Sequence, residues 1–485
     1  MAKICLVKPP FYKLYGVGKS HFPLGVGYIA SVLEGAGHDV SFVDGDVLDY
    51  NLCKGLLSNS IVNGVLFYAD PYFMERRFNA VSRIMQDESN PVWDILIERI
   101  VKTKPEIIGI SCYTVNMTAV NIIANRIKSV LGDIPIILGG IHPTSNPQRT
   151  LDEIKSADYI VVGEGEKTFQ ELADAIGSKA IAPIRIDGVL ARGNSYFKPR
   201  ELIKDINSIP FPRRDFTDQS NYIFGAPILT SRGCMYQCAF CASHVMWTRK
   251  VRFRSVENVI GELKLLKDKF STKRIRILDD TFVLNKKWIA QFCKRLKEEK
   301  LSFSFNCSGR INTVDEELFK MLSESGFDSI AFGVESGSPG VIERIKKNID
   351  LSKVPEVIKM ANRYGFDTTA FFMTGHPGET LEDMRMSEDL FRRSMAKRGE
   401  LSMLIPYSQT AAGIEAERQG LRFGVKDYYK FQHSRNRIVF NITRLPDKEL
   451  LDEHNRFERI VQSRNYYTLA KKIARLAVQF IKGKI

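Results

Sequence analysis

The 485-residue sequence contains no apolar run long enough to cross a bilayer, which takes about 20 residues. Its first residues lead directly into a strand-like segment, without the separate apolar region of a secretory signal. Cysteine is scarce, with eight residues, and apart from one tight group these are scattered. Scattered cysteines fit a reducing compartment better than a disulfide framework. The sequence therefore predicts a globular, cytoplasmic protein with room for two or three domains.

Positive charge is in excess, because 70 Lys and Arg stand against 56 Asp and Glu and give a net charge of +14. Such an excess favours anionic substrates, a membrane surface or nucleic acid, or simply covers a solvated surface. No patch interleaves basic and aromatic residues, which argues against nucleic acid. The stretch 467–485 has apolar residues at helical spacing with basic residues between them. It either contacts a membrane peripherally or packs its apolar stripe on its own domain.

The tight cysteine group consists of Cys234, Cys238 and Cys241, in the spacing Cys-x3-Cys-x2-Cys. Three thiolates can hold three irons of a 4Fe-4S cluster and leave the fourth iron open to a small molecule, whereas electron-carrying clusters normally take four cysteines. A zinc knuckle or a chance grouping are the alternatives. Zinc sites more often pair Cys-x2-Cys with a second pair elsewhere, and none is visible. The spacing favours a cluster that binds its reactant.

Residues 1–185 alternate short apolar runs with amphipathic ones, which is typical of a doubly wound, Rossmann-like parallel sheet. The stretch 48–92 interrupts this pattern and looks like an insertion. Ligands of such sheets bind at the carboxyl ends of the strands, so we expect the ligand surface in the loops after Ile110, Leu138 and Val162. The expected strands are 4–7, 40–43, 107–110, 134–138 and 159–162, with helices at 25–37 and 119–131.

A second array begins after an irregular, proline-containing linker at 186–222. Residues 223–420 predict a partial (β/α)6 barrel, in which chemistry takes place at the carboxyl ends of the strands. The cysteine group follows its first strand. Residues 421–485 predict a mostly helical C-terminal region. The expected barrel strands are 226–230, 274–278, 302–306, 329–332, 368–373 and 401–405.

The cysteine loop, with aromatic Phe240 before its last cysteine, resembles that of radical S-adenosylmethionine (SAM) enzymes. The first 185 residues resemble the cobalamin-binding domain fused to one large subgroup of these enzymes. The resemblance covers about residues 1–415, and the order of its motifs carries more weight than any one of them. Those motifs are Pro23-Leu-Gly-Val-Gly-Tyr28, Ser111-Cys-Tyr-Thr114, Gly139-Gly-Ile-His-Pro-Thr144, Gly163-Glu-Gly-Glu166, Asp279-Asp-Thr-Phe282, Arg310, Gly333-Val-Glu-Ser-Gly337 and Gly375-His-Pro-Gly-Glu-Thr380.

The resemblance implies that the three cysteines ligate the cluster and that its open iron chelates SAM. Asp279 and Asp280 would then contact the ammonium group of SAM, and Ser308 and Arg310 its carboxylate. Glu335 would bond the ribose, and Phe240 would also belong to this site. As alternatives, Asp279 is a helix cap, and Arg310 and Glu335 form an ordinary ion-paired rim.

Cobalamin is the second cofactor that the resemblance implies, held by glycine loops that let the sheet edge approach the corrin closely. The sequence has no Asp-x-His-x-x-Gly run, so we expect no histidine from that motif on cobalt. His142 lies in a candidate loop, where a lone histidine more often stabilises the loop by a hydrogen bond. The expected contacts are Leu24, Gly25, Tyr28, Ser111, Tyr113, Thr114, Gly139, Gly140, His142, Thr144, Gly163, Glu164 and Glu166.

The resemblance implies a cobalamin-dependent radical methyltransferase acting on an unactivated carbon, or on phosphorus, through a 5′-deoxyadenosyl radical and methylcobalamin. A non-methylating radical reaction (cyclisation, ring contraction, oxygen insertion or dehydration) is the alternative, and a non-catalytic sensor is another. An electron donor such as flavodoxin or ferredoxin is the expected partner. Where relatives often read Pro-x-Pro-Gly-Thr, this chain reads Pro406-Tyr-Ser-Gln-Thr410, in a loop that we expect to border the substrate. The sequence identifies no catalytic side chain, and it leaves open whether the substrate is a small molecule, a lipid or a protein side chain.

Overall fold

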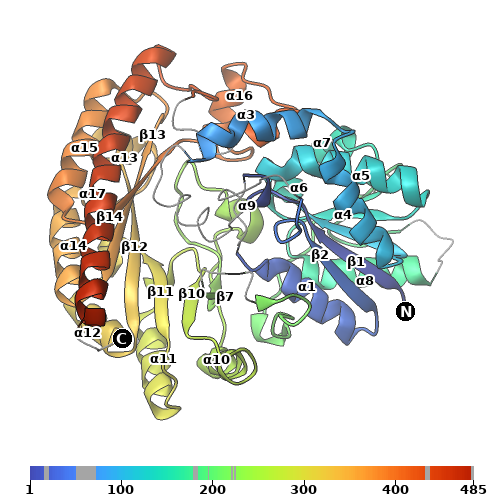
Figure 1. Cartoon of the computed structure of the whole chain (residues 1–485), viewed down its shortest axis with the longest axis horizontal. Coiled ribbons are helices and arrows are strands. Elements are labelled where there is room, and N and C mark those ends of the chain that lie inside the picture. The colour runs from blue at the N-terminus through green and yellow to red at the C-terminus, as the bar shows by residue number, and fades with distance from the viewer. Residues whose placement is uncertain are drawn as a thin grey trace.

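The computed structural model describes residues 1–15, 21–50, 73–178, 184–194, 196–219, 222, 225–431 and 437–481. Two six-stranded sheets form its two halves, and they lie side by side with irregular segments and a short helix between them (Figure 1). The predicted fold class, a Rossmann-like sheet followed by a partial barrel and a helical C-terminal region, is confirmed.

The N-terminal sheet has the strand order β2-β1-β3-β4-β5-β6, and all its pairs are parallel except β5 with β6. Its strands are nearly all buried, as expected of a parallel sheet covered on both faces. Their bounds are β1 (Lys3–Lys8), β2 (Asp39–Asp44), β3 (Ile107–Ser111), β4 (Ile136–Gly139), β5 (Tyr159–Val161) and β6 (Val189–Ala191).

Helices cover both faces of this sheet, and separate apolar clusters lie on the two sides. Local signals start several of them; Pro91, for example, opens one helix while Asn90 accepts a hydrogen bond from the Val92 N–H at 3.2 Å. The helices are α1 (Leu24–Gly35), α3 (Phe73–Gln86), α4 (Pro91–Lys102), α5 (Met117–Leu131), α6 (Ile141–Ser145), α7 (Pro147–Glu153) and α8 (Gly165–Gly177).

The second sheet runs in the order β7-β10-β11-β12-β13-β14, entirely parallel, which is the sequential order of a partial barrel. A separate two-stranded antiparallel ribbon, β8 with β9, encloses the cysteine loop. The strands are β7 (Ala226–Ile228), β8 (Ser231–Arg232), β9 (Arg252–Phe253), β10 (Arg274–Ile277), β11 (Ser304–Gly309), β12 (Phe327–Glu335), β13 (Asp367–Thr374) and β14 (Arg398–Met403).

Helices cover the outer face of this sheet, and the long last helix packs against β14 (Figure 1). A capping box starts one of them: Thr380 accepts from the Asp383 N–H at 3.2 Å, and Asp383 accepts from the Thr380 N–H at 3.0 Å. The helices are α9 (Ser243–Trp247), α10 (Val256–Phe270), α11 (Lys286–Glu298), α12 (Glu316–Glu324), α13 (Pro339–Arg344), α14 (Val354–Arg363), α15 (Leu381–Ser394), α16 (Ala411–Arg418) and α17 (Asp447–Ile481).

Some predicted boundaries need correction. The strand expected at 302–306 is β11, Ser304–Gly309, because buried Cys307 acts as a small apolar residue and continues the alternation beyond Asn306. Of the insertion expected at 48–92, residues 51–72 lie outside the described residues, and the later part forms α3. Neither β6 nor the β8–β9 ribbon was predicted: β6 lies within the stretch expected to be a linker, and β8 and β9 have two residues each, too few to show a period.

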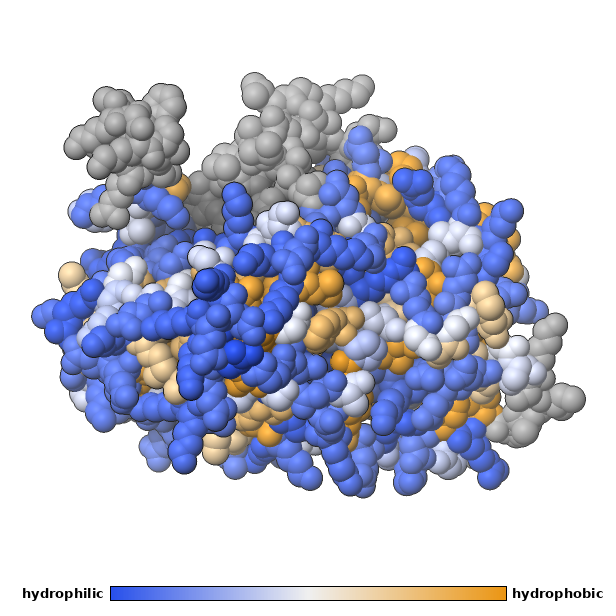
Figure 2. Space-filling view, turned by 90° about the horizontal axis from the view of Figure 1, so that it is seen from below, coloured by the Kyte–Doolittle hydropathy of each residue, from blue (hydrophilic) through white to orange (hydrophobic). Residues whose placement is uncertain are grey.

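The face seen in Figure 2 is mostly hydrophilic, with small apolar patches rather than one continuous apolar surface. Within the part of the chain that the structure describes, no helix combines the length and the apolarity needed to cross a membrane.

Candidate functional site

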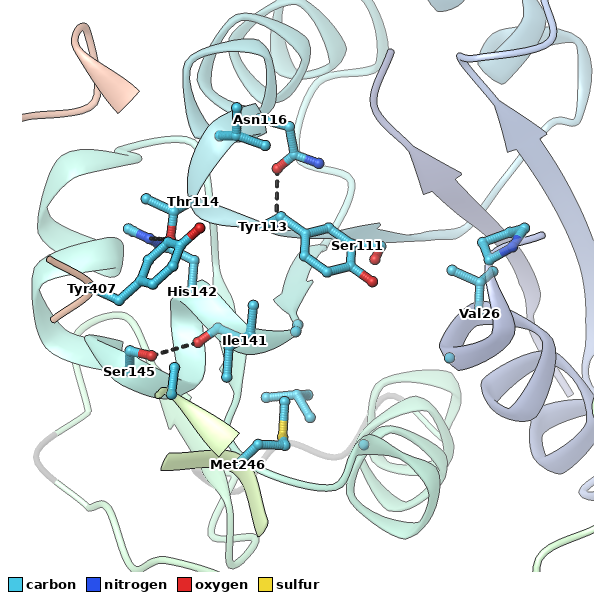
Figure 3. Close-up of a pocket in the computed structure, with 18 of the residues that line it drawn as sticks. Val26, Ser111, Tyr113, Thr114, Asn116, Ile141, His142, Ser145, Met246 and Tyr407 are labelled. Carbon is cyan, nitrogen blue, oxygen red and sulfur yellow. Dashed lines mark hydrogen bonds between the residues drawn. The ribbon is translucent and has the colours of Figure 1, made fainter. Parts of the chain in front are cut away.

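A cavity of about 890 Å³ lies where the loops of the N-terminal sheet face the cysteine loop. Residues from the carboxyl ends of β1, β3, β4 and β5 line one side, and Cys241, Trp247 and Asp280 from the barrel half line the other. Figure 3 shows the Tyr113 ring beside Ser111 at the end of β3, with Val26 of the helix α1 on the far side of Ser111. The cavity thus joins the ligand edges of both sheets, as expected for parallel sheets with their helices outside.

The cysteine loop begins with a turn that only glycine allows. Gly233 has a φ of +99°, and a Cβ there would lie 2.2 Å from the carbonyl oxygen of Lys250 on the other side of the loop. The thiols are partly exposed and face different neighbours: Cys234 Sγ lies 3.9 Å from Thr281 Oγ1, and Cys238 Sγ accepts from Arg310 Nη1 at 3.8 Å.

These thiols fit a cluster by chemistry and by accessibility. Among the described residues, no three His, Cys, Asp or Glu side chains are arranged to hold a single metal ion. A 4Fe-4S cluster makes a different demand, because each cysteine binds its own iron. Cys241 faces the cavity, and its Sγ accepts the Ser243 N–H at 3.4 Å, a contact of the kind that tunes cluster sulfurs.

The two predicted SAM carboxylates have different surroundings. Asp279 is buried and accepts from the Thr230 N–H at 2.7 Å, the Thr230 hydroxyl at 2.5 Å and the Ser231 hydroxyl at 2.6 Å. Its carboxylate therefore holds the strand-to-loop connection that leads into the cysteines. Asp280 lines the cavity, and its Oδ2 accepts from Ser243 Oγ at 2.8 Å.

The other predicted SAM residues lie around the cysteine loop. The Arg310 guanidinium stacks 3.6 Å from the Tyr236 ring centroid, and its Nη2 also donates to the Lys347 carbonyl oxygen. Glu335 accepts from Lys347 Nζ at 2.7 Å, and at a φ of +72° it holds a backbone conformation that is rare outside glycine. Lys347 Nζ also lies 5.8 Å from the ring centroid of Phe240. Ser308 lies on β11, partly exposed.

Most of the predicted cobalamin residues do line the cavity. Gly140 has a φ of +118°, and a Cβ there would lie 2.6 Å from the Cys112 carbonyl oxygen, so this edge of the cavity requires glycine. Thr144 lies behind the surface and accepts the Gly163 N–H at 3.0 Å, which shapes the neighbouring loop. The predicted residues at the wall are Leu24, Gly25, Tyr28, Ser111, Tyr113, Thr114, Gly139, Gly140, His142, Gly163, Glu164 and Glu166.

His142 makes the loop-stabilising hydrogen bond expected of it and keeps its other ring nitrogen unpaired among the described residues. Its Nδ1 lies 3.0 Å from Thr114 Oγ1, which stabilises the loop, whereas its buried Nε2 has no hydrogen-bond partner among the described residues. Burial lowers the His142 pKa to about 3, so the ring is neutral. An orphaned polar atom on the wall of a cavity fits the presence of a ligand there.

Glu164 and Glu166 are engaged by arginines of the barrel half. Arg232 donates to Glu164 at 2.7 Å and to Glu166 at 2.6 Å, and Arg252 donates to Glu164 at 2.7 Å. The Arg232 guanidinium also lies 5.2 Å from the ring centroids of Tyr28 and of Trp247. We call the two glutamates and two arginines the clasp, because they tie the β5–α8 loop to the ribbon around the cysteines.

Several residues of the site were missed by sequence reasoning. Pro406, Tyr407 and Ser408 line the cavity as expected of their loop, but Tyr428 and Phe431 of the C-terminal region line it too. Their only sequence signal is aromatic content in a stretch without clear period. Buried His376 and Glu379 lie in the motif 375–380, which was recognised without roles for these side chains.

Comparison with known proteins agrees with this geometry. Residues 228–391 match the family model of the radical SAM superfamily, and residues 72–173 match that of the B12 binding domain. The chain is 31% identical over 417 residues to an uncharacterized methyltransferase of Pyrococcus horikoshii, PH0819, which covers 84% of this chain and 82% of the relative. The chain therefore belongs to the radical SAM superfamily, among members that carry a B12 binding domain.

Two further matches are a relative in sequence and a solved structure of similar fold. The anaerobic magnesium-protoporphyrin IX monomethyl ester cyclase of Rubrivivax gelatinosus is 23% identical, over 86% of this chain and 73% of its own. The structure of the radical SAM methyltransferase TsrM from Kitasatospora setae, with cobalamin and a [4Fe-4S] cluster bound, superposes with a TM-score of 0.66. It is 19% identical and covers 86% of this chain and 78% of that one. The predictions of a radical SAM enzyme, and of cluster, SAM and cobalamin as its cofactors, are confirmed at the level of these domains, and the methyltransferase prediction is supported.

Proposed function

We propose that this enzyme transfers a methyl group from SAM, by way of cobalamin, to an unactivated carbon or a phosphorus centre of a substrate bound in the cavity. The observation that carries the proposal is the single cavity that both the cysteine loop and the B12-domain loops line. A methyl carrier and a radical generator must reach the same substrate atom, and a shared cavity supports this.

When bound, the three cofactors supply the electron, the 5′-deoxyadenosyl radical and the methyl group. The residues of the chain hold and enclose them. Cys234, Cys238 and Cys241 would bind the cluster, and Asp280 would orient SAM from the cavity wall. The apolar and aromatic C-terminal segment, with Tyr407 and Tyr428, would exclude water, which protects a radical from side reactions.

The remaining expected partners follow from the same proposal. An electron donor such as flavodoxin or ferredoxin would reduce the cluster from outside, since Met235 in the cysteine loop is 59% exposed. We also propose the cytoplasm as the location, supported by the scattered cysteines.

The test incubates the reconstituted, chemically reduced enzyme with SAM carrying a deuterated methyl group and a deproteinised extract of the native cells. We expect S-adenosylhomocysteine and 5′-deoxyadenosine in equal amounts, with a deuterated methyl group in one small molecule of the extract. Cys238→Ala should abolish 5′-deoxyadenosine, whereas Cys293→Ala, at a buried cysteine of α11, should retain it.

The outcomes separate the alternatives. 5′-Deoxyadenosine formed without S-adenosylhomocysteine would rule out methylation and favour cyclisation or another non-methylating radical reaction. Absence of SAM cleavage by the fully reconstituted enzyme would favour the sensor.

A further inference from the structure

The inner face of the second sheet carries arginines whose surroundings differ. On β10, Ile275 and Ile277 belong to the apolar core under the outer helices, so the alternating Arg274 and Arg276 face the barrel lumen. Asn306 of β11 is the register partner of Arg276. Arg398 of β14 lies at the opposite edge of the same sheet.

Two of these arginines have a carboxylate partner. Arg274 Nη2 lies 3.0 Å from Asp328 Oδ1, and Arg398 is ion-paired with Asp367. The positive charges of Arg274 and Arg398 are therefore compensated by carboxylates of the same sheet.

Arg276 is different. Its Nη1 lies 3.0 Å from Nδ1 of His21, and no carboxylate of the described residues lies within 4.0 Å of its guanidinium. Burial and the neighbouring Arg276 lower the His21 pKa to about 4, so the imidazole is neutral and accepts this hydrogen bond. The histidine thus orients the guanidinium without neutralising it.

Arg276 does not itself line the cavity but adjoins it, because its hydrogen-bond partner His21 is part of the cavity wall. Leu278, two residues further along the same face, lines the cavity, as do His21 and Tyr12, whose rings lie 6.2 Å apart. Arg276 itself is half-buried. A partly desolvated positive charge next to a binding cavity is costly unless an anion joins it.

We propose that Arg276, oriented by His21, binds an anionic group of the substrate, a carboxylate or a phosphate-type oxyanion. Its Nε and Nη2 have no hydrogen-bond partner among the described residues, so two donors of the planar guanidinium are available for bidentate binding. This inference rests on the proposed function, because it places the substrate between the barrel lumen and the B12-domain loops. The excess of positive charge in the whole chain agrees with it.

The test measures binding of two small probes, methylphosphonate and propionate, to the reconstituted enzyme. Line broadening of the ³¹P signal of methylphosphonate and of the ¹³C carboxylate signal of labelled propionate reports binding without any turnover. The variants are Arg276→Gln, Arg276→Lys and, as the matched control on the same strand and face, Arg274→Gln.

We expect saturable broadening by the wild type and by Arg274→Gln for at least one probe. Affinity should fall about tenfold in Arg276→Gln, the effect of losing a charged hydrogen-bond donor. Arg276→Lys should retain part of the affinity, since it keeps the charge. The probe that binds more tightly identifies the anion class.

Two results would overturn the inference. Equal broadening by the wild type and Arg276→Gln would show that the probes bind elsewhere. The carboxylate of SAM is the competing anion, so SAM binding is followed through its effect on the electron paramagnetic resonance (EPR) spectrum of the reduced cluster. Loss of that effect in Arg276→Gln, without probe binding by the wild type, would assign Arg276 to SAM. Neither result touches the methylation proposal, which depends on the ratio of the SAM products.

Discussion

At the scale of single residues, adjacent side chains of one motif have separate tasks. Asp279 and Asp280 follow β10 after Leu278, yet the first accepts hydrogen bonds from Thr230 and Ser231 and the second lines the cavity. Alternation along the backbone turns neighbouring side chains to opposite sides. A motif of two carboxylates therefore contains one position that holds the backbone and one that lines the cavity.

This division predicts opposite effects of two similar substitutions. Asp279→Asn replaces one carboxylate oxygen with an NH2 group, which cannot accept the hydrogen bonds that Thr230 and Ser231 donate. The substitution should therefore lower the free energy of unfolding by about 2 kcal/mol. Asp280→Asn should change stability by less than about 1 kcal/mol but weaken SAM binding about tenfold, because a charged contact is lost. Urea denaturation and SAM titration followed by EPR check both; a loss of SAM affinity in both variants at equal stability would contradict the division.

Glu379 shows how burial makes a single carboxyl sensitive to pH. It is fully buried, and its Oε2 accepts from the N–H groups of Gly375 at 2.6 Å and His376 at 3.1 Å. Burial outweighs these donors and raises the Glu379 pKa to about 8, above the usual value of 4.5. The folded protein therefore keeps this proton while the unfolded chain releases it, and stability falls as the pH rises from 4.5 to 8.

Glu379→Gln should remove that loss. We expect nearly unchanged stability at pH 5 and a variant more stable than the wild type at pH 9, by a few kcal/mol at about 1.4 kcal/mol per pKa unit. Thermal denaturation at the two pH values measures it. The exposed Glu382→Gln is the control, and a parallel shift in both variants would show that Glu379 is not the titrating group.

At the scale of elements, α17 completes the outer cover of the barrel half. Phe457 is buried, with its ring centroid 5.6 Å from that of Phe372 on β13 and 6.0 Å from that of Phe391 on α15. Further along the helix, Tyr466 and Tyr467 are exposed. The first part of α17 therefore packs on its own domain. Peripheral membrane contact by the stretch beyond it stays a prediction.

Phe457→Ala should therefore destabilise the protein by about 3–5 kcal/mol, the usual loss for a buried phenylalanine. Tyr466→Ala, on the exposed part of the same helix, should change stability by less than about 0.5 kcal/mol. Urea denaturation of the two variants checks the contrast. Similar values for both would mean that α17 does not stabilise the sheet.

Elements with a clear period could be predicted from the sequence, and partners distant in the chain could not. The strand around Ile108 is a short apolar run, the strand around Ile275 alternates arginine with isoleucine, and the cysteine spacing is itself local. By contrast, Arg276 meets His21 across 255 residues. No local pattern encodes such a contact, because it depends on how two finished sheets meet.

At the scale of the whole molecule, the cavity exists only if the two sheets keep their relative position. Two domains of one chain move relative to each other unless a large apolar interface or specific contacts hold them. The clasp fixes the relative orientation of the two halves, because Arg232 forms buried ion pairs with two carboxylates of the opposite half. Glu164 and Glu166 were predicted as cobalamin contacts from the sequence of their loop alone. The arginines that pair with them are distant in the chain and could not be assigned to the loop from the sequence.

The clasp couples the stabilities of the two halves, and a double-mutant cycle measures the coupling energy. Arg232→Met leaves Glu166 buried without its partner and should cost about 3–5 kcal/mol. Glu166→Gln in the same chain removes the orphaned charge, so the double variant should be more stable than the sum of the single losses by about 1–3 kcal/mol. The half-exposed pair Arg213–Glu34 is the control, with a coupling below about 1 kcal/mol. Because the clasp joins the loop beside the corrin site to the ribbon around the cysteines, cobalamin affinity should fall in Arg232→Met and recover in part in the double variant. Additive losses, with cobalamin affinity unchanged throughout, would mean that the halves are positioned by other contacts.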